Sequence, residues 1–215
     1  MLEEDGFNIF EELSTKDKIL FMSLELFSQR GYEGVSMRDI ATAVNIKGSS
    51  IYKHYKSKQD IFNSIVSYME LRYNEAMSLL QLPKGEALSV VDTYMNISNE
   101  KLFDIVYKIF LYFHEDPYTS KFRRILIMEQ YRNPVIRNTF KKIYFENALV
   151  FQEELFTVLI EGGMFKNVDA KIMALQFYAP IYLLICQYDS IEGKEEEVKE
   201  ILRKHVYQFA EMYEC

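Results

Sequence analysis

Apolar residues recur every three or four positions along most of this 215-residue chain. That period is typical of an α-helix. β-Hairpin signals, such as Asn-Gly between alternating apolar runs, are nearly absent. Helix breakers are also scarce, with eight glycines and four prolines in the whole chain. The pattern therefore predicts an all-α protein.

Capping signals delimit the first two predicted helices. The pair Ser14-Thr15 can cap a helix that ends at Gly31. Ser36 begins a second, short helix, because Asp39 three residues later completes an acidic variant of the capping box. This helix ends at Asn45, since asparagine tolerates the left-handed backbone conformation.

Residues 46–55 predict a third short helix. Its inward positions are expected to be Ile51, Tyr52 and Tyr55. Ser57 then caps a fourth helix, whose apolar face reaches Tyr73 and which continues to about residue 80. Two short helices joined by a tight turn form a helix-turn-helix, a motif that inserts its second helix into the major groove of DNA.

The second half of the chain predicts a helical bundle, which the fourth helix joins to the first half. A linker at residues 82–86 and breaks at proline or glycine separate its helices. These helices are expected over residues 86–99, 101–113, 119–131, 134–161, 169–189 and 195–213. The predicted domains are therefore residues 12–80 and 81–215.

Charge is distributed unevenly along the chain. The sequence contains 25 Lys and Arg against 32 Asp and Glu, a formal net charge of −7. Between Ser36 and Lys58, five basic residues accompany one acid, Asp39, so this segment carries +4 and the remainder −11. A basic patch on an acidic body attracts phosphate to one face. The helix-turn-helix segment is thus expected to bind DNA.

Several classes of protein do not fit this sequence. Its two cysteines, Cys186 and Cys215, suggest neither a disulfide framework nor a zinc site. Nucleophile–base, phosphate-loop and paired-carboxylate motifs do not stand out. The first residues are acidic where a signal peptide is basic, and the apolar run at 177–186 is shorter than the ~20 residues of a membrane span. We expect a cytoplasmic protein that is not an enzyme and has no cofactor, metal or membrane partner.

Residues 15–62 resemble the DNA-binding domain of the TetR family of transcriptional repressors. The resemblance rests on Leu-Phe before Gln-Arg-Gly-Tyr, on Ser-x-Arg-Asp-Ile-Ala, on Ser-Ser-Ile-Tyr-Lys-His-Tyr and on the following Lys-Ser-Lys. In that family the rest of the chain is a variable helical domain for ligand binding and dimerisation. The resemblance implies a repressor that a small, largely apolar effector releases from a palindromic operator in double-stranded DNA.

The resemblance also implies which residues contact DNA. They are Ser36, Arg38, Lys47, Gly48, Ser49, Ser50, Tyr52, His54, Tyr55 and Lys58. Asn45 stands where the family often has glycine, and Lys47-Gly48-Ser49 resembles a rearranged form of the common Ser-Lys-Gly. Packing in the core is the alternative for Tyr55. A metal role for His54 is disfavoured, since no other metal ligand lies at a suitable spacing.

The second domain is rich in aromatic residues, which suit a small-molecule site when a few hydroxyl groups accompany them. Twelve of the sixteen tyrosines follow residue 72. From helix faces and the family's habit of enclosing ligand between its middle helices, the expected effector site comprises Tyr107, Phe110, Phe113, Tyr144, Tyr178 and Tyr182. The alternative is that these rings belong to the core.

One recognition helix reads too few base pairs for useful specificity, so a homodimer is expected. Its interface should come from residues 134–161 and 169–189, which are too apolar for one buried stripe. In the first of these helices Leu149, Phe156 and Ile160 are expected to face away from the intramolecular core.

Two other functions remain open, a helical enzyme and an interaction protein without a specific operator. The cluster His114-Glu115-Asp116 is interpreted as a helix C-terminus.

Overall fold

The computed structural model describes residues 12–79, 87–95, 97–189 and 191–215, and its regular elements there are all helices. They belong to two compact units, and two helices, α4 and α7, contribute to both. Unit 1 comprises Met1–Tyr73 and Lys121–Asn133, and unit 2 comprises Asn74–Ser120 and Pro134–Cys215. The predicted boundary at 80/81 and the linker at 82–86 lie outside the described residues. The domain assignment 12–80 and 81–215 stays a prediction.

The two capping predictions in unit 1 are confirmed. Helix α2 (Thr15–Arg30) begins after Ser14, whose Oγ accepts a hydrogen bond from the Asp17 amide at 3.2 Å. Helix α3 (Met37–Ala43) begins with a complete capping box between Ser36 and Asp39. Both serines satisfy amides that the first helical turn leaves without a partner.

The segment after α3 differs in part from its prediction. Asn45 adopts the expected left-handed conformation, with φ of 56°. Residues 46–55, however, form turns around one 3₁₀ turn, η1 (Ile51–Lys53), instead of a regular helix. The Lys-Gly-Ser-Ser run that precedes η1 has low helix propensity and no apolar face. Within η1 only Ile51 is buried, and Tyr52, predicted to face inward, is 58% exposed.

Helix α4 (Lys58–Leu79) is the long helix predicted after Ser57, whose Oγ accepts from the Asp60 amide at 3.1 Å. Its buried face in unit 1 consists of Ile61, Phe62, Ile65 and Met69. Tyr73 was expected to continue this face but is 40% exposed. It is the last residue that α4 contributes to unit 1, so the packing of that unit ends there.

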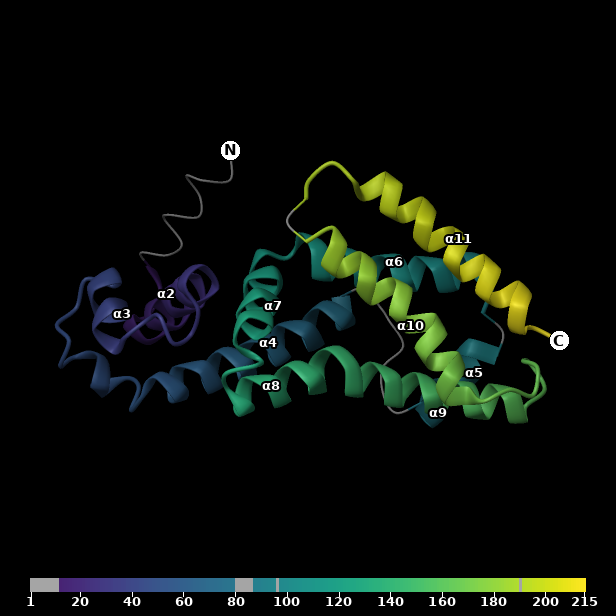
Figure 1. Cartoon of the computed structure of the whole chain (residues 1–215), viewed down its shortest axis with the longest axis horizontal. Coiled ribbons are helices and arrows are strands. Elements are labelled where there is room, and N and C mark those ends of the chain that lie inside the picture. The colour runs from purple at the N-terminus through teal and green to yellow at the C-terminus, as the bar shows by residue number, and fades with distance from the viewer. Residues whose placement is uncertain (1–11, 80–86, 96, 190) are drawn as a thin grey trace. The chain divides into compact units, whose positions relative to one another are not determined.

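The remaining helices follow the predicted order (Figure 1). They are α5 (Ala87–Met95), α6 (Asn99–Glu115), α7 (Pro117–Glu129), α8 (Pro134–Lys141), the π-helical turn η2 (Lys142–Glu146), α9 (Asn147–Glu161), α10 (Ala170–Gln187) and α11 (Glu195–Tyr213). The predicted helix 134–161 is therefore continuous but contains a π-helical turn. In unit 2, α10 packs along α9, and α11 packs along α6.

The core of unit 2 corrects one prediction about α9. Phe156 is 6% exposed, and its ring centroid lies 5.8 Å from that of Phe177 and 5.6 Å from that of Phe209. Leu149 and Ile160 pack against the same core. The expectation that these α9 residues face away from the intramolecular core was wrong, because α10 and α11 supply aromatic rings on their side.

Helix α10 has apolar residues on two faces, as predicted. Met173, Phe177 and Ile181 belong to the core, whereas Ile172 and Leu183 are 50% and 61% exposed. This helix is long and apolar enough to cross a membrane by length and composition alone, although only 33% of it is buried in the structure. Its second apolar face therefore has no cover within the chain that the structure describes.

Candidate DNA-binding site

The N-terminus of α3 presents the first two predicted DNA-contacting residues. Both Ser36 and Arg38 are exposed. The Ser36 hydroxyl donates to Oδ2 of Asp39 at 2.7 Å, and these hydrogen bonds hold the pKa of the Asp39 carboxyl below its usual value, with Arg30 and Arg38 adding to the effect. The one acid of the basic segment is thus charged and committed to the capping box, which leaves Arg38 facing solvent.

The segment between α3 and η1 carries the next four predicted residues. Lys47, Gly48 and Ser49 are exposed and Ser50 is half-buried. The Ser50 amide donates to the Lys47 carbonyl oxygen at 2.8 Å, so this loop is a hydrogen-bonded turn. A Cβ atom at Gly48 would meet no atom within 4 Å, which leaves open space above the backbone. A second molecule can therefore approach the main chain closely at this point.

The aromatic end of this segment divides between surface and core. Tyr52 is exposed and His54 is half-buried, but Tyr55 is only 2% exposed. The Tyr55 hydroxyl donates to the Lys16 carbonyl oxygen at 3.3 Å, and burial, with Asp17 and Asp60 nearby, raises its pKa to about 12. Tyr55 thus packs in unit 1, the alternative to a phosphate contact, and it anchors the segment that carries Tyr52.

Lys58, at the start of α4, is held within the fold. Its Nζ donates to the Tyr32 carbonyl oxygen at 2.7 Å and lies 4.2 Å from the centroid of the Tyr32 ring. The carboxylate of Glu33 lies 3.5 Å from the same nitrogen. The phosphate contact expected of Lys58 stays a prediction, and the structure adds a role in attaching α4 to the loop after α2.

The exposed residues among these, which include Ser36, Arg38, Lys47 and Ser49, form a surface of basic and hydroxyl-bearing side chains on unit 1. Such a surface can bind phosphates through its lysines and arginine and can present small polar groups to base edges.

Sequence reasoning missed the contribution of α7 to unit 1. Its residues lie far along the chain, and no local pattern in them indicates this packing.

The amino-acid sequence of this DNA-binding region is also similar to the sequences of known proteins. A family model described as bacterial regulatory proteins, tetR family, matches residues 19–65. IcaR of Staphylococcus aureus, the negative transcriptional regulator of the biofilm operon icaADBC, is 32% identical over 90 residues, which cover 42% of this chain and 47% of IcaR. Residues 19–65 thus match the DNA-binding region of the tetR family.

Two other known proteins match more of the chain's length. The probable transcriptional regulator YttP of Bacillus subtilis is 26% identical over 152 residues, 71% of this chain and 66% of YttP. The structure of AibR, solved with isovaleryl coenzyme A and operator DNA, superposes with a TM-score of 0.60 at 22% identity, covering 88% of this chain and 96% of that one. The chain spans about half the length of IcaR, and the likeness to AibR establishes the fold.

The six aromatic residues of the predicted effector site form two groups. Tyr107 and Phe110 stack with ring centroids 6.5 Å apart, in line with His114. The other four form a second cluster, in which Tyr144 lies 5.8 Å from Phe113 and 6.1 Å from Tyr182. Tyr178 joins it by donating a hydrogen bond to the Tyr144 carbonyl oxygen at 2.7 Å. These rings fill space against one another.

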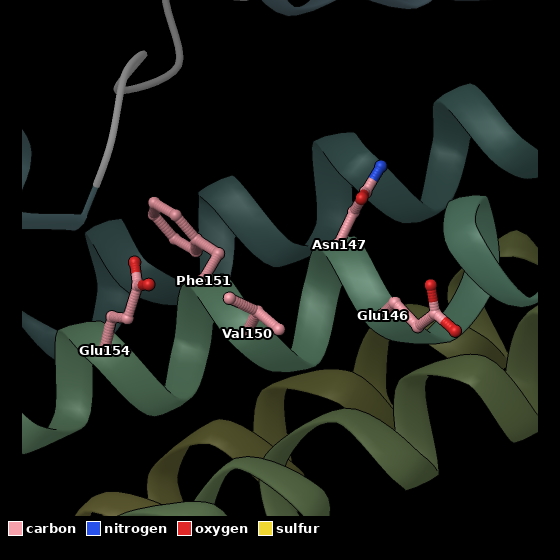
Figure 2. A pocket seen from close by; sticks show the side chains of 5 residues that line it. All are labelled: Glu146, Asn147, Val150, Phe151 and Glu154. Atoms are coloured by element: carbon pink, nitrogen blue, oxygen red, sulfur yellow. The ribbon is translucent and has the colours of Figure 1, made fainter.

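A surface hollow of about 330 Å³ lies elsewhere on unit 2 (Figure 2). Its lining residues come from η2 and α9, and Figure 2 shows their side chains along this one stretch of helix: Glu146, Asn147, Val150, Phe151 and Glu154. None of the six predicted effector-site residues is among them. The rings of the predicted site pack against one another in their two groups instead.

The candidate cluster around His114 lies in the last turn of α6, as its sequence interpretation required. The His114 ring stacks on Phe110 at 5.4 Å, and its Nε2 lies 3.9 Å from Glu195. Among the described residues, no three His, Cys, Asp or Glu side chains gather as a metal site would need.

Proposed function

We propose that this protein is a ligand-responsive transcriptional regulator, a repressor that binds a palindromic operator and leaves it when a small, largely apolar effector binds. The observation that carries the proposal is the exposed basic surface of α3, η1 and the turn between them. Arg38, Lys47 and Lys53 face solvent there beside exposed hydroxyl groups. The similarity to IcaR, a negative transcriptional regulator, and to AibR, whose structure contains operator DNA, supports the proposal.

The residues proposed to contact DNA fall into two classes. The exposed Arg38 and the half-buried Lys58 would hold phosphates and fix the register of the protein on the duplex. Residues 46–55 are here called the recognition segment, and Lys47, Ser49 and Ser50 form its tip. These three residues would face base edges in the major groove. The affinity for DNA would then depend on salt, and the sequence preference would depend on the tip.

The effector is proposed to enter the aromatic cluster of Tyr144, Tyr178 and Tyr182. Burial, together with a hydrogen bond to Cys186, raises the pKa of Tyr182, as expected for a hydroxyl group in an apolar interior. Since the rings pack closely, a ligand must separate them, and the aromatic lining favours an apolar or aromatic compound. AibR, whose structure contains isovaleryl coenzyme A, is a precedent for a small-molecule ligand on this fold.

A homodimer in the cytoplasm completes the proposal. The exposed apolar face of α10, which includes Ile172, Leu175 and Leu183, is suited to contact the same face of a second copy. Two recognition segments held about one helical turn apart, ~34 Å, would read a two-fold operator. The long helix α4 would carry an effector-induced change from unit 2 to these segments.

The test is binding of the DNA upstream of the protein's own gene between 50 and 300 mM salt. Each neutralised phosphate should steepen the log–log slope by roughly 0.9, so affinity should fall steeply. A flat salt dependence, or equal affinity for upstream and random duplexes at every salt concentration, would contradict the proposed function.

A further inference from the structure

The second half of α7 is an integral part of unit 1, although the whole segment Asn74–Ser120 separates it from the rest of that unit in sequence. One face of α7 is buried at helical spacing. Phe122 is 2% exposed, Ile125 and Leu126 are 0% exposed, and Glu129 is 3% exposed. Unit 1, which contains α3 and η1, is therefore completed by a helical segment that follows residue 120 in the sequence.

Two contacts attach the first part of this α7 segment to unit 1. The Phe122 ring lies 6.5 Å from that of Phe62 in α4. Lys121 forms an ion pair with Glu25 of α2, with Nζ and Oε2 2.5 Å apart. Phe62 and Glu25 belong to α4 and α2, the helices that support the recognition segment. Helix α7 therefore contacts both supporting helices through neighbouring side chains.

Glu129, at the end of α7, makes a different contact. Its Oε1 lies only 2.6 Å from the position that a Cβ atom would occupy at Gly31, so the carboxylate rests directly on the main chain there. Its Oε2 is buried and has no hydrogen-bond partner. A buried carboxylate with an unpaired oxygen costs free energy, which makes it an unusual choice for simple packing.

Gly31 begins the turn that leads from α2 to α3. Within this turn Tyr32 and Val35 are buried at 5% and 1% exposure, and Lys58 holds the Tyr32 carbonyl oxygen. The turn ends at Ser36, the cap of α3. Whatever fixes the backbone at Gly31 therefore also fixes where α3 starts relative to α4.

We propose that Glu129 is a positioning residue for operator binding: by filling the space over Gly31, its carboxylate fixes the turn Gly31–Val35 and, through it, α3 with Arg38. The inference rests on the proposed function, since it assigns Glu129 a part in the same DNA-binding surface. The chain passes between the two units in α4, in α7 and again after Asn133, so the segment that carries Glu129 is covalently joined to unit 2 at both of its ends.

The experiment compares the full-length wild type with Glu129→Ala, Glu129→Asp and Glu129→Gln, and uses Glu200→Ala as a matched control. Glu200 is an exposed glutamate of α11 that pairs with Lys204. The affinities for upstream and random duplexes are measured over a range of salt. Amide hydrogen exchange of residues 31–43 and the melting temperature are measured in the free protein. The exchange measurement does not require any DNA binding.

Glu129→Ala should lower affinity for the upstream duplex about tenfold and for random DNA by less than about threefold, with the salt slope unchanged because no phosphate contact is lost. Exchange over residues 31–43 should become faster. Glu129→Gln keeps the shape of the side chain and should stay within about twofold of the wild type. Glu129→Asp, which withdraws the carboxylate by one methylene group, should fall between them, and Glu200→Ala should change nothing.

An unchanged ratio of upstream to random affinity together with unchanged exchange in Glu129→Ala would overturn the proposal. A lower melting temperature with that ratio unchanged would show a merely structural role and would also overturn it. If Glu129→Ala does not fold, Glu129→Asp decides by the same two quantities. If the wild type binds no upstream duplex, the proposed function fails, and the exchange data alone decide whether Glu129 positions the turn.

Discussion

Nε2 of His205 in α11 lies 2.8 Å from the carbonyl oxygen of Phe177 in α10. A carbonyl oxygen only accepts, so Nε2 carries the hydrogen. The imidazole also lies 5.6 Å from the Phe177 ring, in the aromatic core of unit 2. Burial lowers the pKa of His205, and the hydrogen bond to Phe177 opposes this effect only in part.

This contact predicts a loss of stability in mild acid. Because the folded-state pKa of His205 lies below the usual value of about 6.5, the unfolded chain binds the proton first as the pH falls. The stabilising contribution is complete above about pH 6.5 and is lost as the pH falls through the folded-state pKa. Urea unfolding at pH 7.5 and pH 5.5 should show a larger decrease for the wild type than for His205→Phe. Equal decreases in the two proteins would refute the prediction.

Gly31 provides a test of the main chain in unit 1. Its φ of 73° and ψ of 159° lie in a region that only glycine adopts readily, and an added Cβ would collide with Glu129. Gly31→Ala should lower the free energy of unfolding by roughly 1–3 kcal/mol for the backbone alone, with the collision added. Gly163, with φ of 78° and nothing within 4 Å of an added Cβ, is the matched control, and Gly163→Ala should cost less.

A double-mutant cycle isolates the collision at Gly31. In a Glu129→Ala background the substitution Gly31→Ala should cost less than in the wild type, by about 0.5 kcal/mol or more. Chemical denaturation of the four proteins measures this coupling. Additive effects would mean that the carboxylate does not occupy the space over Gly31.

Lys58 should contribute to stability as well as to DNA binding. Removing its hydrogen bond to the Tyr32 carbonyl and its contact with the Tyr32 ring should cost about 1 kcal/mol of unfolding free energy in Lys58→Ala. Affinity for operator and random DNA should fall by about the same factor. Lys53→Ala removes an exposed cation and should leave stability unchanged. Thermal unfolding with competition binding checks both, and a change of sequence preference in Lys58→Ala would contradict the expected geometry.

Lys47 should behave differently, because it lies at the tip of the recognition segment. Lys47→Ala should change the preference among operator variants while leaving the unfolding free energy near that of the wild type, since the side chain is exposed. Selection from randomised half-sites measures this preference. An unaltered preference would place the base-reading residues elsewhere in the segment.

The parts of the fold that sequence could predict are those that local chemistry determines. Ser36 and Asp39 form the capping box whose spacing is visible in sequence, and Asn45 takes the left-handed conformation that its side chain tolerates. The apolar periodicity placed the helices of unit 2 to within a few residues. Each of these features depends on residues that are neighbours along the chain.

The parts that sequence could not predict depend on distant partners. Tyr52 and Tyr55 are the same residue type, yet Tyr52 is exposed and Tyr55 is buried. The Tyr55 hydroxyl donates a hydrogen bond to the carbonyl oxygen of Lys16, a residue distant in sequence. The packing of Glu129 on Gly31 joins segments that share no local pattern. Likewise Phe156 was assigned to an outer face because periodicity alone cannot show that α10 and α11 both present rings to it.

The exposed face of α10 gives the last prediction. Phe156 and Leu184 are both 6% exposed inside unit 2, so a glutamate at either position would unfold the chain and could not report on assembly. Leu183 is 61% exposed on the opposite face of the same helix, in line with Ile172 and Leu175. Leu183→Glu should therefore leave the fold intact and convert the dimer to a monomer in sedimentation at micromolar concentration, since a buried pair of like charges opposes association. Operator affinity should fall together with the loss of the dimer, because two recognition segments are needed for a two-fold site.

Ile201→Glu, on an apolar residue of α11 that is 39% exposed, is the control and should remain dimeric. A Leu183→Glu protein that stays dimeric would move the interface away from α10, and a wild type that binds operator tightly as a monomer would remove the need for one.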